Sequence, residues 1–137
     1  MPNTQAVGVA YSDPEFTTCY ASQEIGYSAA AQGTVTQATD KSTGVTLNKS
    51  AGRITMNNAA LAGGAAVSFT LTNSSISIND TIIVNVSSNT TGSAAGAYTT
   101  YVSYLASGSA LITLRNLSAT SYSEAVIINF AIIHGAS

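Results

Sequence analysis

The stretch Ala66-Val67-Ser68-Phe69-Thr70-Leu71-Thr72 is the clearest structural signal in this chain. Apolar and small or hydroxyl side chains alternate along it, so Val67, Phe69 and Leu71 fall on one face of an extended strand. Successive side chains of a β-strand point to opposite faces, which gives this period of two. Valine, phenylalanine and threonine also favour strands. The stretch therefore predicts a β-strand with one buried face.

Similar stretches lie on both sides of this one, separated by turns rich in glycine, serine and asparagine. Strands with turn signals every 8–14 residues are typical of a β-sandwich or jelly roll. The sequence therefore predicts an all-β fold, an antiparallel, jelly-roll-like β-sandwich of about eight strands. Residues 58–63 are expected to form a turn or one helical coil, and residues 87–96 a loop. The predicted strands span residues 34–38, 44–48, 53–57, 66–72, 81–86, 97–106, 110–115 and 123–133.

The first 32 residues follow a different pattern. They contain both prolines, show weak periodicity and end in the small-residue run 28–33. We therefore divide the chain into an N-terminal arm, residues 1–32, and a β-sandwich domain, residues 33–137. Disordered segments are usually poor in aromatic residues. The arm is not, which favours an extended segment docked on a partner rather than a disordered terminus. Its candidate binding residues are Tyr11, Phe16, Tyr20 and Tyr27.

The last predicted strand, residues 123–133, is apolar on both faces. An outer strand of a monomeric sandwich has one wet face. This strand is therefore either central between two layers or in contact with another subunit through its second face. Tyrosine is enriched at protein interfaces. Tyr98, Tyr101 and Tyr104 on the preceding predicted strand are accordingly further candidates for subunit or partner contacts.

Charged side chains make up only 7% of the residues, and the net charge is −2. A typical soluble domain carries about 25%. The surface is therefore either kept soluble by hydroxyl and amide groups or covered by copies of the chain or a larger assembly. The four basic residues are scattered, whereas nucleic acids and anionic membranes attract clusters of them. We therefore expect no nucleic-acid or membrane partner.

Residues with catalytic or metal-binding chemistry are sparse. His134 is the only histidine, and no serine lies in a nucleophile elbow. Cys19 is the only cysteine, so an intrachain disulfide is excluded, and we expect a small buried or partly buried thiol. A structural zinc site needs about four Cys or His ligands. We therefore expect no enzyme, no cofactor and no metal, and we see neither a signal peptide nor a membrane helix.

Several stretches between residues 33 and 134 resemble a module found in structural proteins of tailed bacteriophages. Together they cover about three quarters of the chain. They include Gly33-Thr34-Val35-Thr36-Gln37-Ala38-Thr39-Asp40, Gly52-Arg53-Ile54-Thr55-Met56-Asn57, Val67-Ser68-Phe69-Thr70-Leu71-Thr72-Asn73, Ile112-Thr113-Leu114-Arg115-Asn116-Leu117 and Ile128-Asn129-Phe130-Ala131-Ile132.

This resemblance implies a virion structural protein. Proteins with the module are capsid decoration (cement) proteins or end domains of head or tail fibres, and the short arm suits a decoration protein better. The resemblance then implies a homo-oligomer, commonly a homotrimer, on the outer surface of the capsid, bound to the major capsid protein. The alternative is a fibre tip domain that binds host-surface polysaccharide through Tyr98, Tyr101, Tyr104 and the loop 87–96.

Overall fold

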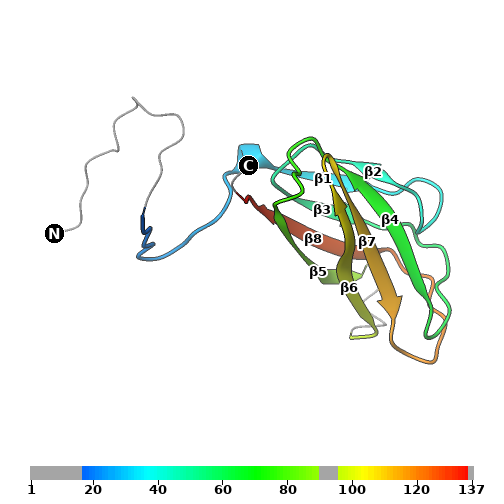
Figure 1. Ribbon diagram of the computed structural model, residues 1–137. Coiled ribbons are helices and arrows are strands. Elements are labelled where there is room, and N and C mark those ends of the chain that lie inside the picture. Colours follow the sequence, from blue (N-terminus) through cyan, green and yellow to red (C-terminus); the bar gives the residue numbers. More distant parts are fainter. Residues whose placement is uncertain (1–16, 90–95, 136–137) are drawn as a thin grey trace.

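The computed structural model describes residues 17–89 and 96–135. Eight strands form two four-stranded sheets that face each other, which confirms the predicted all-β sandwich (Figure 1). A 3-10 turn at Ala29–Ala31 leads into the first strand. The strands are β1 (Gln32–Thr36), β2 (Val45–Thr46), β3 (Ala51–Thr55), β4 (Ala66–Thr72), β5 (Thr81–Asn89), β6 (Tyr98–Ala106), β7 (Ser109–Asn116) and β8 (Val126–Ile133).

The first sheet has the strand order β1-β3-β8-β5, and the second has the order β2-β4-β7-β6. Most neighbours are antiparallel, as expected, but β1 runs parallel to β3 and β2 runs parallel to β4. The sheets are therefore mixed. Parallel neighbours must be joined by crossover connections, because a tight hairpin can only join antiparallel strands. The pairing of strands is thus a property of the topology that alternation within a strand does not encode.

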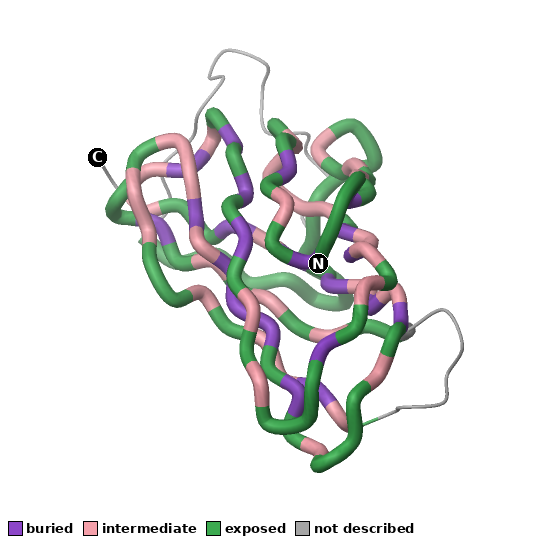
Figure 2. The backbone as a smooth tube through the Cα atoms, turned by 90° about the vertical axis from the view of Figure 1, so that its right-hand side faces the viewer, coloured by how far each residue is buried: buried purple, intermediate pink, exposed green. Residues whose placement is uncertain are grey.

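The core is built from the inward faces that the alternation predicts. On β4, Phe69 and Leu71 are buried while the hydroxyl side chains between them are exposed. On β8, Val126, Ile128 and Ile132 are fully buried. Figure 2 shows buried and exposed positions alternating along the strands. The apolar core therefore lies between the two sheets, where each strand contributes every second residue.

The β8 strand lies inside its sheet, paired with β3 on one side and β5 on the other. Its inward face meets the second sheet, but its outward face has no covering layer among the described residues, and Ile133 is more than half exposed there. The central position therefore explains only one of the two apolar faces of this strand.

Two local predictions differ from the structure. The β5 strand continues to Asn89, into the segment predicted as a loop, and its pairing with β8 shifts register between Val86 and Ser88. A bulge at a sheet edge lets polar residues stay paired, so their polarity is misleading as a loop signal. Residues 58–63 contain no helix; Leu61 instead forms an isolated bridge with Tyr122.

Candidate functional site

The described part of the arm projects from the sandwich. Residues 17–26, which we call the projecting segment, run away from the two sheets (Figure 1). All ten of these residues are exposed, including the apolar side chains of Tyr20, at 93%, and Ile25, at 88%. Cys19 is also exposed, which corrects the expectation of a buried thiol. Apolar side chains held this far into solvent gain nothing unless a partner covers them.

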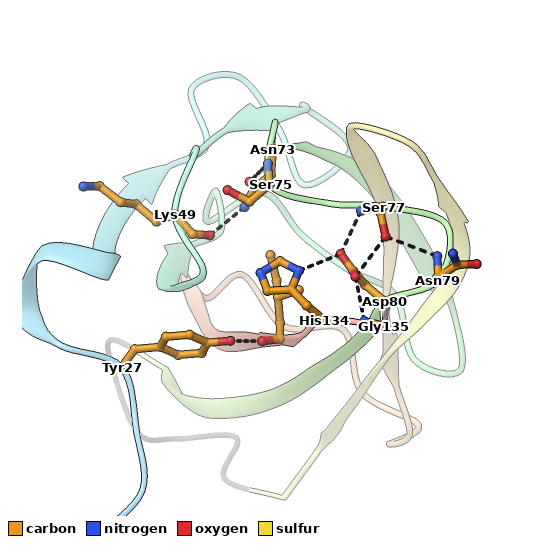
Figure 3. Close-up of polar contacts among 10 residues, drawn as sticks. Tyr27, Lys49, Asn73, Ser75, Ser77, Asn79, Asp80, His134 and Gly135 are labelled. Carbon is orange, nitrogen blue, oxygen red and sulfur yellow. Dashed lines mark hydrogen bonds and ion pairs between the residues drawn. The ribbon is translucent and has the colours of Figure 1, made fainter. Parts of the chain in front are cut away.

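Tyr27 fixes the base of the projecting segment to the sandwich. Its hydroxyl donates a hydrogen bond to the backbone carbonyl of Ile132, near the end of β8 (Figure 3). Lys49 adds a second attachment, because its Nζ donates to the carbonyl of Ala30 at 2.8 Å. Of the four candidate arm residues, Tyr20 and Tyr27 are thus placed, whereas Tyr11 and Phe16 lie outside the described residues.

The three candidate tyrosines of β6 do not form one site. Tyr98 is 8% exposed and belongs to the core, where its ring packs edge-on against Tyr122. Strand alternation and the register shift between Val102 and Tyr104 place the other two on the outer face of the second sheet. Tyr101 is half exposed there and Tyr104 is 67% exposed. Binding through Tyr98 is therefore excluded by its burial, and Tyr101 and Tyr104 remain as the tyrosine face.

A row of hydroxyl groups crosses the second sheet beside the tyrosine face. The Oγ1 atom of Thr113 lies 2.8 Å from the Oγ of Ser68 and 2.9 Å from the Oγ of Ser103. Residues on the outer face of β4, β7 and β6 are thus linked to one another. These hydroxyl groups bond among themselves, and the two exposed tyrosines lie on the same face, which also carries the exposed Arg115.

The outer face of the first sheet carries a groove of about 630 Å³. We call it the sheet groove; it is open to solvent, and Tyr27 forms part of its wall. The floor comes from β1, β3 and β8 and is mainly uncharged. Its principal lining residues are Tyr27, Thr34, Ala51, Arg53, Asn129 and Ala131.

Arg53 is the charged residue of the sheet groove. Its side chain is exposed and makes no hydrogen bond or ion pair with any residue in the described ranges. Cross-strand register places it between Thr34 of β1 and Asn129 of β8 on the same outer face. An arginine in this position can bind a carboxylate through two parallel hydrogen bonds.

His134 is held by Asp80 rather than free at the end of the last strand. Its Nδ1 lies 3.2 Å from Asp80 Oδ2, and the Asp80 side chain is almost completely covered (Figure 3). Asp80 also accepts hydrogen bonds from the backbone N–H of Ser77 at 2.7 Å, the Ser77 hydroxyl at 2.9 Å and the N–H of Gly135 at 3.1 Å.

These contacts stabilise the charged carboxylate. The hydrogen bond from the Ser77 backbone makes the largest contribution to lowering the pKa of Asp80. In a catalytic triad the serine would bond to the histidine. Here Ser77 donates to Asp80 instead. The cluster therefore fastens the C-terminal end of β8 to the turn before β5.

A second buried polar cluster had no signal in the sequence. Lys41, only 3% exposed, donates from Nζ to the backbone carbonyl of Glu124 at 2.5 Å and to that of Asn57. The Glu124 side chain is buried as well. Burial lowers the pKa of Lys41, and the charge of Glu124 partly opposes this effect. Lys41 follows Asp40 in a polar turn, where the ordinary expectation is a solvated ammonium group.

Tyr98 extends this cluster toward the core. Its buried hydroxyl makes no hydrogen bond of normal geometry with a described residue, but the Glu124 carboxylate lies near enough to act on it. Burial first, and then Glu124, raises the pKa of Tyr98 to about 12. The hydroxyl therefore stays protonated at neutral pH, and the cluster joins three loops at one end of the sandwich.

Within the described ranges, no group of three or more His, Cys, Asp and Glu side chains is arranged to hold a metal ion. The same part of the chain contains no helix of the length and hydropathy needed to span a bilayer. Comparisons with protein-family models, curated proteins and solved structures find no significant match to this chain.

Proposed function

We propose that this chain is a virion structural protein, a capsid decoration protein that binds the shell of major capsid protein from outside and stabilises it. The resemblance of residues 33–134 to structural proteins of tailed phages supports the virion assignment. The geometry supports the binding role, because the surface described above has few charged side chains and carries exposed aromatic ones.

One observation carries the proposal: exposed apolar side chains lie on two separate surfaces that suit attachment, in addition to single ones elsewhere, namely Ile78, Ile83, Leu117 and Ile133. Tyr20 and Ile25 lie on the projecting segment, which leaves the sandwich beside the first sheet. Tyr101 and Tyr104 lie on the outer face of the second sheet. A protein that bridges other subunits needs two attachment surfaces, and this arrangement provides them. In our proposal the tyrosine face contacts the shell, and the projecting segment reaches a neighbour.

In such a role, the binding free energies of the many copies on the shell add up. Burying apolar surface contributes about 25 cal/mol per Å² before the costs of association are subtracted. One tyrosine buries about 150–250 Å² at most, so a single copy binds modestly. Copies that hold one another bind together, which raises the avidity of the whole layer. With few charges in the contact, salt screens little of this attraction.

A second function is favoured by the tyrosines and hydroxyl groups of the second sheet. An exposed aromatic ring beside hydrogen-bonding groups can stack on a sugar ring, so a fibre tip domain that binds host-surface polysaccharide is the alternative. The Ser68, Thr113 and Ser103 hydroxyl groups bond to one another, however. A sugar would have to break those bonds, and for this reason we rank the alternative second.

Cryo-electron microscopy of purified particles tests the proposal directly. We expect density for the sandwich spread over the outer shell, with the second sheet facing the major capsid protein. Density only at the tail or at fibre tips would contradict it and favour polysaccharide binding. Absence of the protein from the particle would remove both virion roles.

A binding assay with capsid shells that lack the protein tests whether the tyrosine face contacts the shell. Tyr104→Ser should weaken binding about ten-fold, because an interface hot spot is worth at least about 1–2 kcal/mol. Leu117→Ser, which changes another exposed apolar side chain away from the tyrosine face, is the matched control. Equal binding by wild type and Tyr104→Ser would show that the tyrosine face does not contact the shell.

A further inference from the structure

The arm and the sandwich carry opposite charges. Residues 1–32 contain three acidic side chains and no lysine or arginine, whereas residues 33–137 contain three acidic and four basic ones. Two of those three acids, Asp80 and Glu124, are buried. The exposed surface of the sandwich is therefore weakly basic and can attract an acidic segment.

Individual side chains of the sheet groove and of the projecting segment are also complementary in charge and in apolar character. The groove offers the unpaired guanidinium of Arg53 on a neutral floor. The projecting segment offers Glu24, which is exposed and makes no ion pair or hydrogen bond with the described residues, directly before the exposed Ile25. Beside the groove, Ile83 and Ile133 expose apolar surface on the same sheet. The segment therefore combines a carboxylate with an apolar side chain, and the groove combines an arginine with apolar side chains nearby. The two surfaces are chemically complementary.

The length of the projecting segment suits this face. Ten residues reach up to about 33–36 Å when extended. A four-stranded sheet with strands about 4.8 Å apart is about 15–20 Å wide. One projecting segment is therefore long enough to cross a whole sheet of another molecule.

Of the projecting segment, Gly26 alone lines the groove of its own molecule, and residues 17–25 do not. The bond from Tyr27 to Ile132 holds its base at the edge of that groove, and the preceding residues run outward from there (Figure 1). All of residues 17–26 are exposed as a result. The groove that this segment can fill without reversing its path is one on a neighbouring molecule.

We propose that the projecting segment of one copy binds in the sheet groove of a second copy, with Glu24 paired to Arg53 and Ile25 against the apolar side chains beside it. The inference deepens the proposed function by naming the partner of the arm. Because groove and segment are different surfaces, the contact is head-to-tail, and it closes into a ring when the rotation between copies allows. Two copies of the chain complete a site that neither has alone.

Disulfide trapping tests the contact without any shell. One chain carries Cys19→Ser with Gln23→Cys in the projecting segment, and its partner carries Cys19→Ser with Asn129→Cys beside Arg53. Mixed with oxidised glutathione, which accepts the two electrons and is released as two molecules of reduced glutathione, they should form a covalent heterodimer linked between positions 23 and 129. Thr34→Cys, on the neighbouring strand, replaces Asn129→Cys if that variant does not fold.

The matched control places the partner thiol at Thr70→Cys, on the exposed outer face of the second sheet. Heterodimer yields as high with this control as with Asn129→Cys would overturn the proposal. So would the absence of heterodimer. A chain carrying both thiols that links only within itself would show that the segment binds its own groove, which also overturns the proposal.

Charge exchange tests the specific pair by sedimentation of the purified chain. Arg53→Glu and Glu24→Lys should each weaken self-association about ten-fold, since like charges facing each other oppose binding. The chain with both changes should recover to within about two-fold of wild type, and Arg115→Glu on the second sheet should have no effect. Failure of the double variant to recover would overturn the Glu24–Arg53 pairing.

The two proposals fail independently. Shell binding by a chain that does not self-associate would overturn the arm contact and leave the decoration role in place. Self-association without shell binding would support the arm contact and contradict the decoration role.

Discussion

At the scale of single residues, several of the few charged side chains are buried and hold loops of the sandwich together. Lys41 and Glu124 are buried together, and Asp80 is covered while it accepts hydrogen bonds from Ser77 and Gly135. Buried charges are tolerated where partners replace the lost water. Both clusters lie in connections between strands, so they fix loops against each other. Because these three charged side chains are buried, even fewer charges remain on the surface of the sandwich.

Lys41→Met should lower the free energy of unfolding by about 3–5 kcal/mol, the usual cost of removing one partner of a buried charged contact. The carbonyl groups of Asn57 and Glu124 lose their donor, and the Glu124 carboxylate loses the nearby cation. Urea unfolding measures the loss. Arg115→Met removes an exposed cation and should stay within about 0.5 kcal/mol of wild type. Equal losses in the two variants would show that the Lys41 contacts do not stabilise the fold.

Asp80→Asn should destabilise the protein at neutral pH and lose this effect in acid. The pKa of Asp80 in the folded protein is below its ordinary value of 3.8. Stabilisation by the carboxylate is therefore complete above the unfolded pKa and is lost as the pH falls below 3.8 toward the folded value. Thermal unfolding from neutral pH to below that pH measures it.

In Asp80→Asn the difference in melting temperature from wild type should shrink as the pH falls. Glu24→Gln, which changes an exposed carboxylate without contacts inside its own chain among the described residues, is the control and should melt like wild type at every pH when the protein is dilute enough to be monomeric. A difference for Asp80→Asn that is the same at all pH values would mean that charge is not what the cluster stabilises.

At the scale of the strand, β8 lies in the interior of the first sheet and contributes to the core. It pairs on both sides within the first sheet, and it buries Ile128 and Ile132 against the second sheet. Its other face carries Ile127, Ala131 and Ile133, which no described layer covers fully. One strand therefore serves the core with one face and a candidate interface with the other.

Ile128→Ala should cost about 2–5 kcal/mol of unfolding free energy, because it leaves a cavity between the sheets. Ile133→Ala makes the same chemical change on the exposed face of the same strand and should cost less than about 0.5 kcal/mol in the monomer. Denaturant titration at low protein concentration compares them. Similar losses for both would contradict the assignment of inner and outer faces.

At the scale of the whole molecule, the described part of the chain consists of a sandwich with its own core and a projecting segment that, in our proposal, binds a second copy. The projecting segment adds no residue to the core, whereas Tyr27 ties its base to β8. In our proposal, the stability of the monomer and its assembly therefore depend on different parts of the chain.

Removal of residues 1–26 should change the unfolding free energy of the monomer by less than about 0.5 kcal/mol, because the described part of this segment is exposed. Removal of residues 1–28 also takes away the bond from Tyr27 to Ile132 and should cost about 1 kcal/mol more. Chemical unfolding of both truncated chains gives these values. A large loss on the first truncation would show that the arm is part of the fold.

The alternation of apolar and polar residues was enough to predict the all-β class and the inner faces of the strands. Alternation is a local property, and the placement of Val67, Phe69 and Leu71 on one face follows from it. The same reasoning identified β8 as a strand with two apolar faces. It also singled out Tyr20, Tyr101 and Tyr104, which the structure leaves exposed.

The strand order, the two parallel pairs and the positions of Lys41, Asp80 and Arg53 follow from tertiary packing, as does the choice of the β6 face that meets the core. Each depends on which segments distant in sequence become neighbours, and no local pattern carries that information. Tyr98 and Tyr101 look alike in sequence, yet strand geometry turns one ring into the core and the other to solvent. The sequence was therefore enough to name aromatic residues of the candidate site, but it did not predict how they are arranged in space.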